Sequence, residues 1–110
     1  EAVVGGAGTF LPTTDSADLT SAHTVVSGDI NETHPIGAAT TADFDITLDV
    51  SLLTSTTDKI GFKNKSSYIA RIVVSNTGTM TLNSQYTDKY LSPGEIVVFQ
   101  GDTSTNAVFK

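Results

Sequence analysis

Apolar and polar residues alternate along several short stretches of the chain, and this alternation predicts β-strands. In residues 43–50 every second residue is apolar, namely Phe44, Ile46, Leu48 and Val50. A period of two is that of a strand with one buried face. Ile60 and Phe62 repeat the pattern within residues 59–63. Further β-prone runs cover residues 25–26, 68–75, 79–82, 95–100 and 105–109.

Turn-forming residues separate these runs at short intervals. Asn76-Thr77-Gly78 divides two of them, and Ser92-Pro93-Gly94-Glu95 has the composition of a type II turn, with Gly94 at the position that needs a positive φ. No stretch shows a helical period with caps. The pattern predicts an all-β fold, a small antiparallel β-sandwich or jelly-roll-like barrel of about seven to eight strands.

The N-terminal stretch differs from the rest in composition. Residues 1–22 combine clustered glycines with small polar residues, which predicts an extended N-terminal arm, and residues 23–110 form the β-sandwich domain. The pair Phe10–Leu11 would let the arm bury apolar surface on a neighbouring subunit. The alternative is a terminus that binds nothing.

Composition and charge exclude several classes of protein. A chain of 110 residues is one domain by length, and the absence of Cys excludes disulfides and thiolate metal sites. The net charge of −6 divides into −9 for residues 1–58 and +3 for residues 59–110. A pI of about 4.5 argues against a general nucleic-acid binder. The chain has no apolar run of transmembrane length and no visible signal peptide, and it begins at Glu1 rather than Met.

Candidate chemistry is sparse, and we expect no enzymatic activity and no cofactor. The aspartates at 43, 45 and 49 share one strand face, which predicts a solvated or intersubunit surface rather than a calcium site, because one straight strand cannot surround an ion. His23 and His34 are eleven residues apart, a spacing that matches no zinc motif. We therefore expect no metal site.

The charged residues suggest an interface instead. Lys59, Lys63 and Lys65 share a strand face and are complementary to the acidic half, and Arg71 interrupts an apolar run as a cation facing a partner. We therefore predict that association with a partner or with further subunits weakens in high salt. The predicted interface residues are Phe10, Leu11, Asp43, Asp45, Asp49, Lys59, Lys63, Lys65 and Arg71.

Two segments resemble a module of tailed-phage virion proteins. They are Ile60-Gly61-Phe62-Lys63-Asn64-Lys65-Ser66-Ser67 and Leu91-Ser92-Pro93-Gly94-Glu95-Ile96-Val97-Val98-Phe99, preceded by a strand such as residues 43–48. The resemblance covers roughly residues 40–110. It departs from the usual pattern at the end, where Asn106-Ala107-Val108-Phe109 replaces a Gly-x-Trp strand.

The resemblance implies a non-enzymatic bacteriophage structural protein. The short length of the chain favours a capsid decoration (cement) or head-fibre protein on the outer capsid surface of the virion. The implied partners are the major capsid protein and further copies of the chain, as a trimer or alternatively a dimer, with no nucleic acid and no membrane. Two alternatives remain: a tail-fibre or tailspike module that binds a host glycan through Tyr68, Tyr86 and Tyr90, and a subunit of a secreted surface filament.

Overall fold

The computed structural model describes residues 11–109, and these residues form two β-sheets with no long helix. Sheet I has the strand order β1-β3-β5-β7, and sheet II has the order β2-β4-β8-β9-β6. The strands are β1 (His23–Thr24), β2 (Thr33–Ile36), β3 (Phe44–Leu48), β4 (Lys59–Asn64), β5 (Ala70–Val74), β6 (Thr81–Leu82), β7 (Asp88–Leu91), β8 (Ile96–Thr103) and β9 (Asn106–Phe109). Short 3₁₀ turns, η2 (Ser27–Asp29) and η3 (Val50–Leu52), connect some of them. The predicted all-β class is confirmed.

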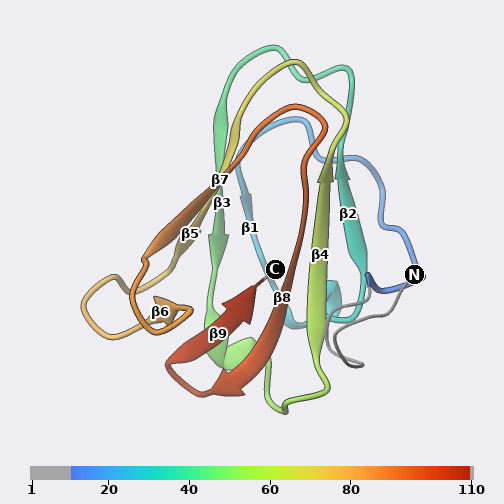
Figure 1. The fold of residues 1–110 in the computed structure, drawn as a ribbon. Coiled ribbons are helices and arrows are strands. Elements are labelled where there is room, and N and C mark those ends of the chain that lie inside the picture. The colour runs from blue at the N-terminus through green and yellow to red at the C-terminus, as the bar shows by residue number, and fades with distance from the viewer. Residues whose placement is uncertain (1–10, 110) are drawn as a thin grey trace.

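The chain alternates between the two sheets from β1 to β8 (Figure 1). A strand of one sheet is therefore followed by a strand of the other, and up to β5 the chain returns to each sheet in its previous direction. As a result β1 pairs with β3, β3 with β5 and β2 with β4 in parallel, and β6 also runs parallel to β9. Antiparallel pairing occurs between β4 and β8, β5 and β7, and β8 and β9.

The predicted antiparallel, jelly-roll-like arrangement is therefore wrong for much of the described fold. Both sheets are mixed, and the winding is that of a β-solenoid over the first five strands. Alternation and turns show which residues are extended and which face they bury, but they do not show which strand becomes the neighbour. A hairpin would have brought the next strand back antiparallel, whereas a crossing to the opposite sheet does not.

The core lies between the sheets and follows the predicted periodicity. The core contains Ile46 and Leu48 of β3 together with Ile60 and Phe62 of β4, and all four side chains are fully buried. Phe62 contacts Phe99 of β8 edge to face, with 6.1 Å between the ring centroids. The burial of these apolar side chains is the main stabilising contribution to the fold.

Two strands were not predicted because their composition conceals them. In β2, Pro35 lacks an N–H group, and β7 is mainly polar. Pro35 is accommodated because its carbonyl faces outward and accepts a hydrogen bond from Leu19 N (2.8 Å), while the neighbouring residues carry the pairing with β4.

The described part of the arm runs beside β2 of its own chain. Thr33 N donates to Thr14 O (2.8 Å), Ser16 N donates to Thr33 O (2.9 Å), and isolated parallel bridges join Asp15 to Thr33 and Leu19 to Ile36. Residues 14–19 therefore cover the outer edge of sheet II. These contacts lie within one chain.

The two segments that carry the phage resemblance meet at Asn64, which is almost completely buried. Its backbone N donates to Glu95 O (2.9 Å) and its carbonyl accepts from Gly94 N (2.8 Å). Its side-chain amide donates to Tyr68 O (2.7 Å) and Leu91 O (2.9 Å). The predicted turn at residues 92–95 is confirmed, since Gly94 has a φ of 85° and Glu95 N donates to Ser92 O (3.0 Å).

Candidate functional site

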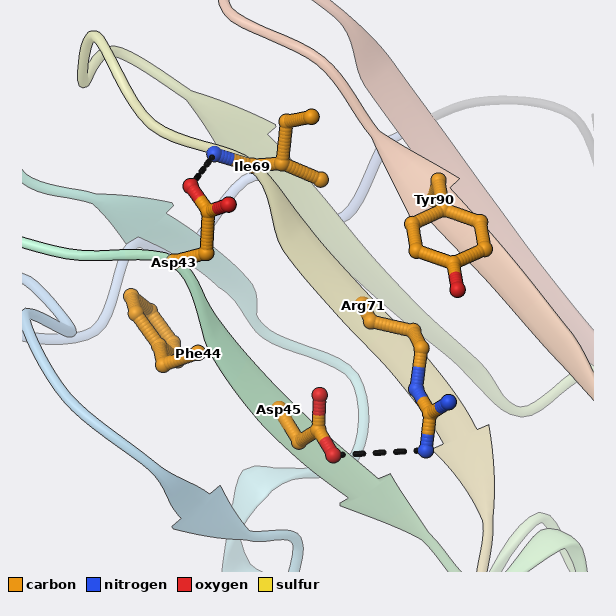
Figure 2. Close-up of a pocket in the computed structure, with 6 residues that line it drawn as sticks. All are labelled: Asp43, Phe44, Asp45, Ile69, Arg71 and Tyr90. Carbon is orange, nitrogen blue, oxygen red and sulfur yellow. Dashed lines mark hydrogen bonds and ion pairs between the residues drawn. The ribbon is translucent and has the colours of Figure 1, made fainter.

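A shallow hollow on the outer face of sheet I brings together three of the predicted interface residues. The strand register places Asp45 of β3 beside Arg71 of β5, and Arg71 beside Tyr90 of β7. Inward-facing residues alternate with these along each strand, so the polar row points to solvent. The hollow has a volume of about 280 Å³ and is lined by Asp43, Phe44, Asp45, Ile69, Arg71 and Tyr90 (Figure 2).

Arg71 is the central cation of this hollow. Its Nη2 lies 3.3 Å from Asp45 Oδ2, and its Nη1 lies 3.7 Å from Asp88 Oδ2. A hydrogen bond with the Tyr90 hydroxyl and the charges of Asp45 and Asp88 raise the pKa of Arg71 above its ordinary value. The guanidinium is thus held by carboxylates on two sides. Its buried Nε has no hydrogen-bond partner among the described residues.

The three aspartates of the predicted stripe have different surroundings. Asp43 Oδ1 accepts a hydrogen bond from Ile69 N (2.8 Å) and joins the start of β3 to the start of β5. Asp45 pairs with Arg71. Asp49 caps η3, where its Oδ1 accepts from Ser51 N (3.0 Å) and Ser51 Oγ (2.6 Å). Only Asp43 and Asp45 line the hollow.

The predicted basic strip of Lys59, Lys63 and Lys65 does not pair with the aspartates at 43, 45 and 49 but lies near other acidic residues. Lys63 Nζ lies 3.0 Å from Asp15 Oδ2, and Lys65 Nζ lies 3.6 Å from Asp18 Oδ1. Both acids belong to the arm, so these ion pairs hold the arm against sheet II. Lys59 lies at the start of β4, where its backbone N donates to Asn31 Oδ1 (3.0 Å).

Of the predicted apolar anchors, Phe10 lies outside the described residues, and Leu11 contacts its own chain. A Cβ on Gly61 of β4 would lie 2.5 Å from Leu11 Cδ2 and 3.3 Å from Pro12 Cδ. The absence of a side chain at Gly61 therefore makes room for the arm on the outer face of sheet II.

The three tyrosines named in the glycan alternative are all exposed. Tyr90, the most exposed of them at 54%, borders the hollow. Tyr86 instead packs near Phe109 of β9, with 6.3 Å between ring centroids. The tyrosines are therefore accessible, although Tyr86 does not belong to the hollow.

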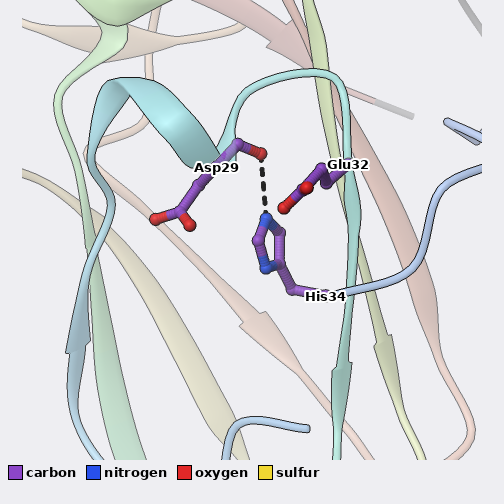
Figure 3. A group of neighbouring side chains, drawn as sticks. All are labelled: Asp29, Glu32 and His34. Carbon is purple, nitrogen blue, oxygen red and sulfur yellow. Dashed lines mark hydrogen bonds between the residues drawn. The ribbon is translucent and has the colours of Figure 1, made fainter. Parts of the chain in front are cut away.

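A second group of side chains converges near the turn between η2 and β2. Asp29, Glu32 and His34 each place a ligand-type atom within 4.8 Å of those of the other two (Figure 3). His34 is buried, with 1% of its surface exposed, and its Nε2 lies 2.9 Å from the backbone oxygen of Asp29. The sequence reasoning missed this group, because its convergence depends on the turn at Asn31, which has a φ of 67°.

Asp29 is also bound by a second imidazole. Its Oδ2 lies 2.9 Å from His23 Nε2 and accepts a hydrogen bond from Val26 N (3.0 Å). Burial acts to raise the pKa of Asp29, but these two hydrogen bonds and the nearby imidazoles outweigh it and lower the pKa below its ordinary value. Asp29 is therefore a carboxylate at neutral pH.

Comparison with known proteins adds no relative. No family model matches the chain, and neither the curated proteins nor the solved structures contain a match to it. Within residues 11–109, no helix is long and apolar enough to cross a membrane.

Proposed function

We propose that the protein is a non-enzymatic structural protein of a bacteriophage virion, most specifically a capsid decoration protein that binds the outer capsid surface. The observation that carries this proposal is the row Asp45–Arg71–Tyr90 on the outer face of sheet I. Arg and Tyr are the residue types most enriched at the centres of protein contacts. Here the two side chains line one hollow, and flanking carboxylates hold Arg71 in place.

The fold supports the same proposal. The residues of the phage resemblance form one connected unit around Asn64, so they serve the architecture rather than a reaction. We propose that the two sheets act as a rigid sandwich-like body that presents the row to a partner. The protein would then act on the capsid through binding alone, without a chemical step.

In this proposal several copies act together. A symmetric homo-oligomer, with a trimer favoured over a dimer, would present the row several times to a repeating capsid lattice. Each contact can be weak, because the linked copies raise one another's effective concentration at the surface. The expected partner at each contact is the major capsid protein.

Capsids that lack the protein provide the test. We expect wild-type protein to co-sediment with them, and Tyr90→Ala to weaken this binding at least tenfold. Tyr86→Ala is the matched control, because it removes an equally accessible tyrosine outside the hollow. If wild-type protein does not bind, or if both variants bind as it does, the proposed contact surface is wrong.

Recognition of a host glycan is the second candidate, and the hollow itself favours it. An exposed tyrosine ring beside two carboxylates and a guanidinium offers both a stacking surface and hydrogen-bonding groups for a sugar. A glycan array distinguishes the two functions. Binding that is lost in Tyr90→Ala would favour the glycan module, and the absence of binding on the array, together with capsid binding, would favour decoration.

A further inference from the structure

We propose that neighbouring copies of the chain exchange residues 11–19, the arm segment, so that the segment of one copy binds to sheet II of a second copy. In the structure the segment lies on β2 and β4 of its own chain, which together form the arm-binding surface. Exchange joins copies through these same contacts. The inference deepens the proposed homo-oligomer and rests on that part of the proposed function.

Two glycines shape the arm-binding surface to this segment. A Cβ on Gly61 would lie 2.5 Å from Leu11 Cδ2, and a Cβ on Gly37 would lie 2.7 Å from Asp18 Oδ2. A side chain at either position would therefore collide with the segment. The surface fits this particular sequence, and every copy of the chain carries both the surface and the segment.

Backbone hydrogen bonds make the fit directional. Leu19 N donates to Pro35 O (2.8 Å), and Gly37 N donates to Leu19 O (2.9 Å). Thr33 Oγ1 donates to the backbone oxygen of Pro12 (2.7 Å). The segment is thus bound as an additional parallel strand, which is a contact that a strand from another chain makes equally well.

Charge complementarity favours a second copy as the partner. The segment is acidic and the surface is basic, since Asp15 Oδ2 lies 3.0 Å from Lys63 Nζ and Asp18 Oδ1 lies 3.6 Å from Lys65 Nζ. Two copies with a net charge of −6 each repel one another overall. The arm-binding surface is a place where an acidic segment of another copy meets opposite charge.

The connection from the arm segment to β1 is the feature that favours exchange. Leu19 bridges to β2 in sheet II and His23 begins β1 in sheet I, so only residues 20–22 cross between the sheets. The next four crossings, up to β5, contain between five residues (65–69) and ten residues (49–58). The first crossing is therefore the shortest of the five.

This short crossing has little slack. The four Cα steps from Leu19 to His23 cover about 14 Å at most, whereas stacked sheets lie about 10 Å apart. The chain bends at Ser21, and residues 20–22 are exposed and make no hydrogen bonds among the described residues. A short connection of this kind favours exchange, because the segment can continue to a neighbour instead of folding back.

Zero-length cross-linking of the full wild-type chain tests the exchange. Equal amounts of ¹⁴N-labelled and ¹⁵N-labelled protein are mixed, and a carbodiimide joins Asp15 to Lys63. At about 1 mM, which matches the effective concentration of a segment on a short connection, we expect about a tenth or more of these links to join a light peptide to a heavy one. Dilution to about 10 µM should remove the mixed links.

The pair Lys89 and Glu95 is the control, because its Nζ and Oε2 lie 3.9 Å apart within the body of the fold. Links between these two residues should join peptides of one isotope only. Mixed links at both pairs would indicate contact between whole molecules without exchange. Links of one isotope at both pairs, at about 1 mM, would overturn the proposal.

The length of the connection provides a matched pair of variants. Deletion of Ser21 should raise the mixed fraction at Asp15–Lys63 about fivefold or more, because two residues no longer cross easily, and insertion of two glycines after Ser21 should lower it. Equal mixed fractions in the two variants would refute the role of the connection. No capsid enters these measurements, so a protein that exchanges its arm but leaves capsids unbound contradicts the proposed function alone.

Discussion

Asn64 is the residue on which two distant segments of the chain depend. Its side chain donates to Tyr68 O and Leu91 O and accepts from Ser66 N (2.9 Å) and Ser66 Oγ (2.7 Å), all at a buried position. In the sequence it is only a polar residue at the end of an apolar run. The structure gives a physical reason for its place in the quoted motif, because the amide satisfies backbone groups that have no access to water.

Removing this amide should be costly. We expect Asn64→Ala to lower the free energy of unfolding by about 3 kcal/mol, because it leaves buried carbonyls unsatisfied. Urea denaturation of the variant measures the loss. Asn76→Ala is the control: its exposed side chain accepts one hydrogen bond from Gly78 N, and we expect a loss below about 1 kcal/mol. Equal losses would contradict this account.

Asp58 makes stability depend on pH. Hydrogen bonds, first from the Asn31 amide and then from Thr54, lower the pKa of Asp58 below its ordinary value. The folded state therefore favours the carboxylate, so its contribution is present above the ordinary pKa and is lost as the pH falls through the lowered one. We expect urea denaturation between about pH 5 and about pH 2 to show a smaller loss of stability for Asp58→Asn than for wild type. Parallel pH profiles would contradict this.

At the scale of elements, the inward faces of the strands could be predicted, but their partners could not. Alternation correctly assigned Ile46 and Leu48, and then Ile60 and Phe62, to the core. It could not indicate a crossing between sheets after each strand, because a parallel and an antiparallel neighbour bury the same face. Pro35 made β2 hard to predict for a related reason. A proline is tolerated in a strand only where its missing N–H group does not face a hydrogen-bonded neighbouring strand, and the sequence does not show which side that is.

The candidate sites were predictable to a different extent. Asp43, Asp45 and Arg71 stood out by their positions in otherwise apolar strands, and the cross-strand register brought them together with Tyr90. The cluster at His34 left no such sign. Its three residues converge only because Asn31 turns the chain and is held by β4, which is a tertiary contact.

Close approach of a loop to β8 gives a sharp test of the described packing. A Cβ on Gly101 would lie 2.2 Å from the backbone oxygen of Ser55. We expect Gly101→Ala to destabilise the fold by about 3 kcal/mol in thermal or urea unfolding, because backbone must move. Gly28→Ala should change it by less than about 1 kcal/mol, because that position has open space. If the two variants are equally stable, the loop does not pack as described.

The arm pairs with the edge strand β2, and deleting the arm should show how much this pairing stabilises the fold. We expect a chain without residues 1–20 to fold, because the strands and core lie beyond them, but to lose about 2 kcal/mol of stability with the pairing hydrogen bonds. Urea denaturation measures this loss. The deletion also uncovers the backbone of β2, so size-exclusion chromatography should show more self-association. An unchanged unfolding free energy would mean that the arm is not paired in solution.

For the whole molecule, the division of charge along the chain becomes a pattern of ion pairs within it. The lysines of β4 face the arm, and Arg71 faces Asp45, so much of the complementarity is already used inside one subunit. What remains for partners is a net charge of −6 and the row on sheet I.

Salt should therefore act on association through the row. We expect capsid binding of the wild-type protein to weaken between about 0.05 M and about 0.5 M NaCl, because screening reduces attraction between exposed charges. Arg71→Gln should bind more weakly and lose most of this dependence. Co-sedimentation measures capsid binding of the wild type and of the variant. If wild-type binding does not change with salt concentration, the contact is made mainly by apolar groups.

The alternating path between the sheets also has a consequence for how the chain folds. The first strands pair in the order in which they leave the ribosome, but β4 is paired along almost its whole length with β8, which is made much later. Until β8 is made, one edge of β4 is unpaired and the ring of Phe62 lacks its contact with Phe99. Closing such distant contacts is slow. Completion of sheet II therefore waits for β8 and β9, and a nascent chain that ends before residue 96 presents an open sheet edge to other chains.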